Sequence, residues 1–445
     1  MVGYHNMTKM PKLFFSSLLW LALFFNINEV SSQQITLSEC IQVALQNHPD
    51  VKNGYLQTGL AKVQIDQAKS NFMPEMSAGI YQAGNFGRSI DRFTNSYINQ
   101  FYNSTWAGVN LNIPLFTSFR NSHLLSSARS TYLATEQAQA NAKMQTTQTV
   151  IAAYLNSLTQ YESINNALKQ LKNDSIQYHR LTVRKSVGLT TKTEELQLLN
   201  QQKADELALV DAQLNYEISI VELSTAINRP LPKSTQLTGI EVDKTMGMYI
   251  NQPLNMDLPQ LAASKWRRQA LDENIKATKA LAYPTIGLSA NYGTFYASSN
   301  PDRNFSEQLN DTRNGSISVS LSIPILRSLQ TRPQVQELKL SQLILQNDLD
   351  KMTLQLNQAL SQAKTRYQHI QSKHLVASEL LLLSDQNMQL IQEQLEAGTA
   401  MMVDFLLAQN NLNKAQSALT QTKYQLIGQE LLIKYFTTSK FEIGE

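Results

Sequence analysis

The segment Val109-Asn-Leu-Asn-Ile-Pro-Leu-Phe-Thr-Ser-Phe119 returns later in the chain as Val319-Ser-Leu-Ser-Ile-Pro-Ile-Leu-Arg-Ser-Leu329. The two copies are 210 residues apart, and the same offset separates Pro74 from Pro284. Self-similarity at one fixed offset indicates one structural unit that is built twice. The sequence therefore predicts two copies of the same fold within 445 residues.

Each quoted segment closes a stretch in which apolar and small polar residues alternate. Ile317, Val319 and Leu321 alternate with serines, as Val109 and Leu111 alternate with asparagines. A period of two predicts strands with one apolar face, and about 10 residues suffice to cross a bilayer at a tilt. No Lys, Arg, Asp or Glu lies on the apolar faces of 286–292 and 317–323. With aromatic residues near the strand ends, this pattern is typical of outer-membrane barrel strands, although a soluble hairpin also fits each pair alone.

Long helices dominate the rest of each unit. Neither Gly nor Pro occurs between Pro114 and Gly188, or between Pro333 and Gly398. Runs of about 60 residues would extend about 90 Å as helices, a length that favours coiled-coil packing. Each Gly is expected to end a helix and turn the chain into an antiparallel partner helix. Those partners, and the helices that open each unit, are expected at 192–226, 402–434, 37–71 and 258–282.

The start of the chain resembles a secretory signal peptide. Lys9 and Lys12 precede an apolar run, Leu13 to Phe25, and small residues then allow cleavage before Gln33. The run is shorter than the about 20 residues of a spanning helix, and a retained anchor is the alternative. The single cysteine, Cys40, excludes an intrachain disulfide. A net charge of +3 gives no basic footprint for nucleic acid.

We accordingly expect four segments. They are a signal peptide over 1–32, a first repeat over 33–228, a joining segment over 229–256 and a second repeat over 257–445, with strand hairpins at 74–114 and 284–324 and helical turns at 188 and 398. The joining segment could be a mere linker or a small packed collar.

Four strands cannot close a membrane barrel, because about eight are the practical minimum. An open sheet edge in lipid would leave backbone groups without partners. The membrane interpretation therefore requires several copies: two would give eight strands and three would give twelve. Side chains fill the lumen of an eight-stranded barrel, so only the larger barrel could conduct.

The order of these motifs resembles the TolC-like outer-membrane efflux protein family over essentially the whole mature chain. The similar pieces are Leu111–Phe116 and Leu321–Leu326 at the strand ends, the turns 187–194 and 397–404, and the opening 37–49. The resemblance implies an α+β fold in which a homotrimer forms a 12-stranded β-barrel in outer-membrane lipid. A periplasmic α-helical coiled-coil tunnel continues the barrel.

The resemblance also implies a function and its partners. Such a duct is the exit of a tripartite efflux pump or of type I secretion. An inner-membrane RND or ABC transporter supplies the energy, and a periplasmic adaptor (membrane fusion) protein docks on the helical turns. It implies no catalysis and no cofactor. The adaptor contacts would be Val187, Gly188, Leu189, Thr190, Ala397, Gly398 and Thr399.

The same resemblance places a periplasmic gate just beyond the turns. Glu194 and Asp404 follow the two glycines by six residues, and three copies of each would ring the pore. A first-turn acid favoured by the helix dipole is the simpler interpretation. Ala400 and Leu407 stand where an Arg and an Asp are common in the family. An ionic lock is therefore in doubt, and we expect hydrophobic closure by residues among Leu407, Met401, Met402 and Phe405.

The residues give little support for an enzymatic function. The chain has no Walker loop, dinucleotide fingerprint or nucleophile elbow, and His369 and His374 are poorly spaced for a shared metal on one helical face. An exported helical scaffold or adhesin is the alternative class, but it leaves the duplicated bilayer-length hairpins unexplained. Neither the substrate nor the transporter can be read from the residues.

Overall fold

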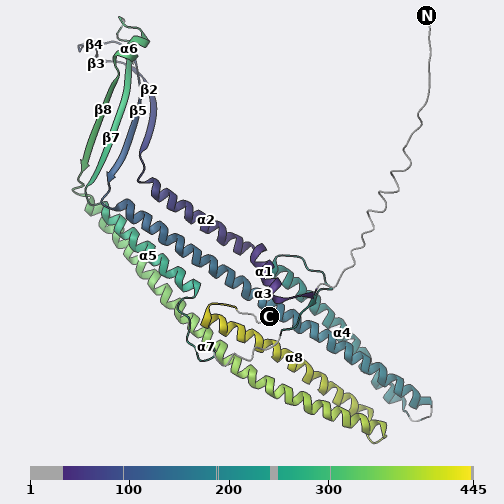
Figure 1. Ribbon diagram of the computed structural model, residues 1–445. Helices are drawn as coiled ribbons and strands as arrows, with labels where there is room; N and C mark the ends of the chain where they lie inside the picture. Colours follow the sequence, from purple (N-terminus) through teal and green to yellow (C-terminus); the bar gives the residue numbers. More distant parts are fainter. Residues whose placement is uncertain are drawn as a thin grey trace, which may run out of the picture.

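The computed structural model describes residues 34–93, 95–186, 188, 190–240, 249–300 and 302–441, so the expected signal peptide lies outside the described residues. The described chain is elongated: a sheet stands at one end, and a bundle of long helices runs away from it (Figure 1). These elements are mostly helical with one main sheet, which confirms the α+β class.

The first unit consists of two helices, a strand pair and a long helical hairpin. In chain order these are α1 (Leu37–Asn47), α2 (Pro49–Ser70), β2 (Glu75–Asn85), β5 (Tyr102–Phe116), α3 (Arg120–Ser186) and α4 (Lys192–Ile227). The expected opening helix is interrupted at His48, because Pro49 restricts the backbone of the residue before it. A Thr36–Glu39 capping box starts α1.

The second unit repeats this order with a single opening helix. Its elements are α5 (Pro259–Ala280), β7 (Thr285–Ala297), β8 (Asn314–Ser322), α7 (Arg327–Glu396) and α8 (Met402–Thr438). The helix α7 begins before Pro333, so this proline lies inside it and not at its start as the sequence suggested. The missing N–H of Pro333 removes one backbone hydrogen bond near the start of this 70-residue helix, which continues to Glu396.

One four-stranded antiparallel sheet joins the two units, in the order β2-β5-β7-β8. The central pair comes from different units, because β5 pairs with β7 from Ser104↔Ala297 to Phe116↔Ile286. Within the described chain, β2 pairs only with β5 and β8 only with β7. Each outer edge of the sheet is therefore left without a strand partner.

Short elements decorate the outer end of the sheet, opposite the helices (Figure 1). They are the hairpin of β3 (Arg88–Ile90) and β4 (Tyr97–Asn99), and the helix α6 (Phe305–Asp311). The sequence pattern did not reveal them, since each spans only a few residues in a polar stretch.

The helical bundle buries its core at the level where the units meet. Tyr154 of α3 is fully buried there, and its hydroxyl donates to the carbonyls of Ile35 (2.8 Å) and Thr238 (2.9 Å). Ile35 belongs to β1 (Gln34–Ile35), which pairs with β6 (Gln236–Leu237) in a two-stranded sheet, and Thr238 directly follows β6. Leu237 and Leu254 of the joining segment are buried in the apolar clusters of the bundle, so its described part packs on the helices.

Candidate functional site

Both helical turns adopt the backbone that glycine favours. Gly188 has φ 77° and Gly398 has φ 75°, the left-handed region in which other residues are strained. The amide of Gly398 donates to the carbonyl of Leu395 (3.2 Å), and that of Thr399 to the carbonyl of Gln394 (2.9 Å). Thr190 and Ala397 flank the turns, whereas Val187 and Leu189 lie outside the described residues.

The two turns lie together at the end of the molecule farthest from the sheet (Figure 1). Arg180 of the first hairpin forms an ion pair with Glu396 of the second at 2.5 Å. Behind the turns the hairpins share a small apolar core of Leu181, Leu198, Leu395, Met402 and Phe405. The turns thus form one joint surface, although 210 residues separate them in sequence.

The acidic candidates cap the helices that follow the turns. The Glu194 carboxylate accepts the amide of Thr191 at 2.9 Å, and the Asp404 carboxylate accepts the amide of Met401 at 3.1 Å. Such caps satisfy backbone donors that the first turn of a helix leaves free. This agrees with the simpler interpretation of the two acids, and their place in a pore remains a prediction.

The apolar gate candidates divide into two groups. Met402 and Phe405 are 4% and 0% exposed, because they fill the core shared by the hairpins. Met401 and Leu407 are 66% and 61% exposed. Of the four, only this second pair is exposed in the single chain, and closure of a passage by these residues remains a prediction.

A buried acid between the hairpins escaped the sequence analysis. Asp174 of α3 is fully buried, and it accepts hydrogen bonds from Gln409 of α8 (2.7 Å) and Gln170 (3.4 Å). Burial, with a hydrogen bond and repulsion from Asp205 of α4, raises the pKa of Asp174 to about 7. Its second oxygen accepts no hydrogen bond from the described residues, and it can hydrogen-bond to the Asp205 carboxylate only by carrying a proton. These surroundings therefore favour the protonated form of the Asp174 carboxyl. The signal in the sequence that could have indicated this is a single polar residue on an otherwise packed helix face.

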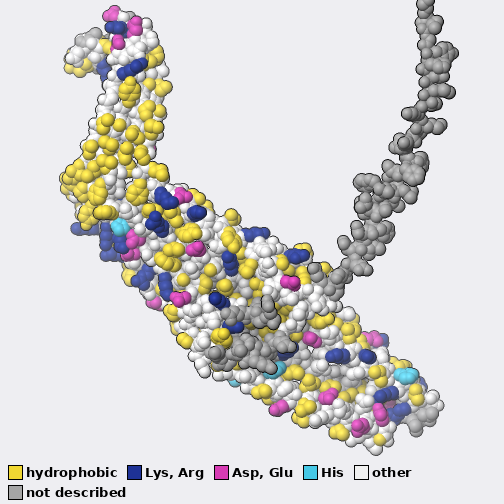
Figure 2. Space-filling model, in the orientation of Figure 1, with side chains coloured by type: hydrophobic (Ala, Val, Ile, Leu, Met, Phe, Trp, Pro, Cys, Tyr) yellow, Lys and Arg dark blue, Asp and Glu magenta, His cyan; other side chains and the backbone are white. Residues whose placement is uncertain are grey.

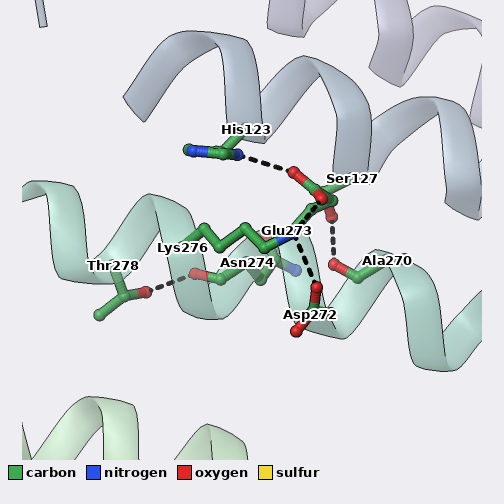
Figure 3. Close-up of polar contacts among 8 residues, drawn as sticks. All are labelled: His123, Ser127, Ala270, Asp272, Glu273, Asn274, Lys276 and Thr278. Atoms are coloured by element: carbon green, nitrogen blue, oxygen red, sulfur yellow. Dashed lines mark hydrogen bonds and ion pairs between the residues drawn. The ribbon is translucent and has the colours of Figure 1, made fainter. Parts of the chain in front are cut away.

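A second polar cluster joins the units just below the sheet (Figure 3). Glu273 of α5 accepts from His123 of α3 (2.7 Å) and from Lys276 (2.7 Å), while Ser127 of α3 donates to the carbonyl of Ala270 (2.8 Å). Burial alone would raise the pKa of Glu273, but the bonds from Lys276 and His123 outweigh it and lower the pKa. The cluster fixes the seam between the repeats.

The sheet has one apolar and one polar face. Across its four strands, Val109 pairs with Ala78 and Tyr292 on the apolar face. On the polar face Asn110 pairs with Asn291, and the hydroxyls of Ser289 and Ser318 lie 2.8 Å apart. Apolar side chains cover much of the sheet, whereas charged side chains gather on the helices and at the outer end (Figure 2). The apolar side chains are exposed in the single chain, among them Met76, Ile80, Val109, Tyr292, Ile317, Val319 and Leu321.

None of the helices that the structure describes is both long enough and apolar enough to span a membrane. Among the same described residues, no group of three or more His, Cys, Asp or Glu side chains could hold a metal ion.

A membrane-length sheet with an apolar face, carried on long helical hairpins, defines a class of outer-membrane transport conduits. The family model "Outer membrane efflux protein" matches residues 40–229 and 256–433. The chain belongs to the outer membrane efflux protein family, whose members are conduits and not enzymes, and it resides in the outer membrane.

Individual relatives are distant in sequence and similar in fold. The outer membrane efflux protein BepC of Brucella suis is 22% identical over 398 residues, which are 88% of this chain and 83% of BepC. VceC of Vibrio cholerae has a TM-score of 0.76 at 15% identity, covering 91% of this chain and 97% of VceC. The Campylobacter jejuni CmeC channel has a TM-score of 0.75 at 16% identity, covering 92% of this chain and 87% of CmeC.

Proposed function

We propose that three copies of this chain form the outer-membrane exit duct of a tripartite efflux pump or a type I secretion system. The duct is passive: an inner-membrane transporter of the RND or ABC type delivers substrates to it through a periplasmic adaptor. In this proposal residues 33–228 and 257–445 act as two similar units, and three chains surround the passage with six.

The observation that carries the proposal is the four-stranded sheet with two open edges. A sheet with an exposed apolar face belongs in lipid, where unpaired backbone N–H and C=O groups each cost several kcal/mol. Pairing β8 of one copy with β2 of the next removes every open edge once the ring closes. Twelve strands leave a lumen, whereas eight would be filled by side chains.

Exposed apolar stripes on the helices support the same assembly. Leu207, Val210, Leu214, Ile218 and Val221 are exposed along α4 at spacings of three and four residues. Val376, Leu380, Leu383 and Leu390 are exposed along α7 at spacings of four, three and seven residues, which also keep to one face of a helix. Stripes of this kind are seams between packed helices, and here they would pack between neighbouring copies.

The joint surface of the two turns is the proposed adaptor site. It comprises Gly188, Thr190, Ala397, Gly398 and Thr399, with Val187 and Leu189 included from the sequence. Behind it, Leu407 and Met401 are the proposed apolar closure, and Glu194 and Asp404 would ring the passage.

The first experiment is the native mass of the protein extracted from the outer-membrane fraction in mild detergent. Three copies per particle support the shared barrel. A soluble monomer refutes the duct and favours an exported scaffold.

A charge on one face of β8 provides a matched pair of variants. Ile317→Lys places a cation on the apolar face, at a cost of about 2–4 kcal/mol per copy at mid-bilayer. Ser316→Lys places it on the polar face, one residue away. We expect Ile317→Lys to be lost from the outer-membrane trimer and Ser316→Lys to be retained. Equal recovery of both variants would contradict the assignment of the two faces.

A further inference from the structure

Three aromatic side chains form a row across the polar face of the sheet near its outer end. Tyr81 of β2 pairs with Trp106 of β5, and Trp106 pairs with Phe295 of β7. Because side chains alternate along a strand, the row shares its face with Asn110 and Asn291. In the proposed barrel this is the face that lines the lumen.

Two glycines hold the central ring of the row flat against the sheet. Gly108 and Gly293 are a cross-strand pair, two residues along each strand from the Trp106–Phe295 pair and therefore on the same face. A Cβ atom at Gly108 would overlap the Trp106 indole, and one at Gly293 would lie 3.2 Å from the indole Nε1. The indole thus occupies space that is open only because both residues are glycines, so the Trp106 side chain packs directly on the backbone of the sheet on this face.

The β3–β4 hairpin closes over one end of the row. The ring of Phe93 lies 6.4 Å from that of Phe295, centroid to centroid, and the Arg92 guanidinium carbon lies 4.7 Å from the Phe295 centroid. Asp91, which is buried, accepts the amide of Phe93 at 2.7 Å and so fixes the turn. The guanidinium is therefore held on the aromatic row.

The row differs from the aromatic belts of membrane barrels, which face lipid at the water boundary. On the apolar face, the level next to the row on its helix side carries Ile80, Ala107 and Thr294, and the level on its outer side carries Gln82, Thr105 and Tyr296. A boundary aromatic on the lipid side would thus be Tyr296. The row lies on the opposite face, so it is not itself an anchor in the membrane boundary.

We propose that Tyr81, Trp106 and Phe295, together with Arg92, form a contact site for planar aromatic anions at the outer end of the lumen. The rings offer faces on which a flat molecule stacks, and the guanidinium attracts its negative charge. Tyr81 is 66% exposed, so its ring is open to such a molecule. The inference rests on the proposed duct, in which three such sites would surround the exit.

Orientation is tested first by tryptophan fluorescence. Of the three tryptophans, Trp20 lies in the expected signal peptide, so a Trp266→Phe variant keeps Trp106 as the one indole of the exported chain. In vesicles of brominated lipid we expect Trp106 to escape quenching, while acrylamide in the water quenches it. A control that replaces Trp106 and Trp266 with Phe and carries Tyr292→Trp, on the apolar face, should be quenched by the bromines. Quenching of Trp106 by brominated lipid overturns the proposal.

Binding is tested with pyranine, a water-soluble planar aromatic trisulfonate, by fluorescence anisotropy on the detergent-solubilised protein. Losing one stacking partner weakens binding about three- to tenfold, so Tyr81→Ser should bind less tightly and Tyr81→Phe should bind like the wild type. Arg92→Gln should also weaken binding. Arg88→Gln is its matched control, because Arg88 stacks on Tyr97 within the same hairpin at 4.6 Å.

The outcomes separate this inference from the duct itself. A monomer in detergent refutes the duct and, with it, the inference. A trimer refutes only the aromatic site if Tyr81→Ser binds pyranine as the wild type does. The same holds if Arg88→Gln weakens binding as much as Arg92→Gln.

Discussion

Replacing Asp174 by Asn should remove a pH dependence from the packing of the two helical hairpins. Asn has the shape of a protonated Asp and the same hydrogen-bonding groups, so it can accept from Gln409 and donate toward Asp205. It never carries a charge into this buried position. The substitution therefore separates the effect of the proton from the effect of the packing.

The magnitude follows from the shifted acid. The pKa of Asp174 rises from 3.8 to about 7, first through burial and then through the hydrogen bond and charge of Asp205. The folded chain thus binds more protons than the unfolded chain between these values, and its stability falls as pH rises through this window. About three pKa units correspond to at most about 4 kcal/mol per copy, which is lost in full above pH 7. Because part of the shift of Asp174 comes from its interaction with a second acid, Asp205, we expect a smaller loss.

The assay is amide hydrogen exchange of α8 around Gln409, corrected for the intrinsic rate, together with thermal unfolding at pH 5 and pH 8. Wild type should lose protection and melting temperature at the higher pH. Asp174→Asn should be more stable than wild type at pH 8, and by a smaller margin at pH 5, where only about one of the three pKa units of the window has been crossed. Asp385→Asn, an exposed acid of α7, is the control and should change neither profile. The reasoning fails if Asp174→Asn keeps the pH dependence of the wild type.

Three further predictions concern other parts of the chain. Leu407→Asp should increase the leak of hydrophilic antibiotics through the outer membrane, because it replaces apolar closure by charge; unchanged permeability in a susceptibility assay would refute this. Glu273→Gln should lower the melting temperature at pH 7 by an amount equivalent to about 1 kcal/mol. Since the pKa of Glu273 is lowered, its contribution is present above about pH 4.5 and is lost as pH falls through the folded value, so the difference between variant and wild type should shrink as pH falls below 4.5. Burial raises the pKa of Cys40 to about 12, so a thiol reagent should label it only after unfolding; rapid labelling of the native protein would contradict its burial.

Much of the fold follows from local patterns. The alternation at Val109, Leu111 and Ile317 predicted strands with one apolar face, and the structure confirms that face. The absence of Gly and Pro predicted helices as long as the 67 residues of α3. These features depend only on neighbours along the chain, which a sequence displays directly.

The rest depends on contacts between distant segments. Asp174 is buried because Gln409, 235 residues later, packs on it from the second hairpin. Met402 and Phe405 turn into the shared core for the same reason, whereas Leu407 does not. The packing of Trp106 on the sheet needs Gly108 and Gly293, which come from different units and meet only when β5 and β7 pair in the correct register. The adaptor surface and the gate remain predictions, because they concern contacts with other molecules.

The pairing of β5 with β7 has a consequence for the order in which the molecule folds. Helix pairs such as α3 with α4 join neighbouring segments and can form while the chain is still emerging. The centre of the sheet can form only after β7 has been synthesised, because Ser104 of β5 pairs with Ala297 of β7. Long-range pairing is slow, and open strand edges invite aggregation in the meantime. The helical part is therefore expected to form first and hold the strands together. A holding chaperone in transit would then need to shield the sheet alone.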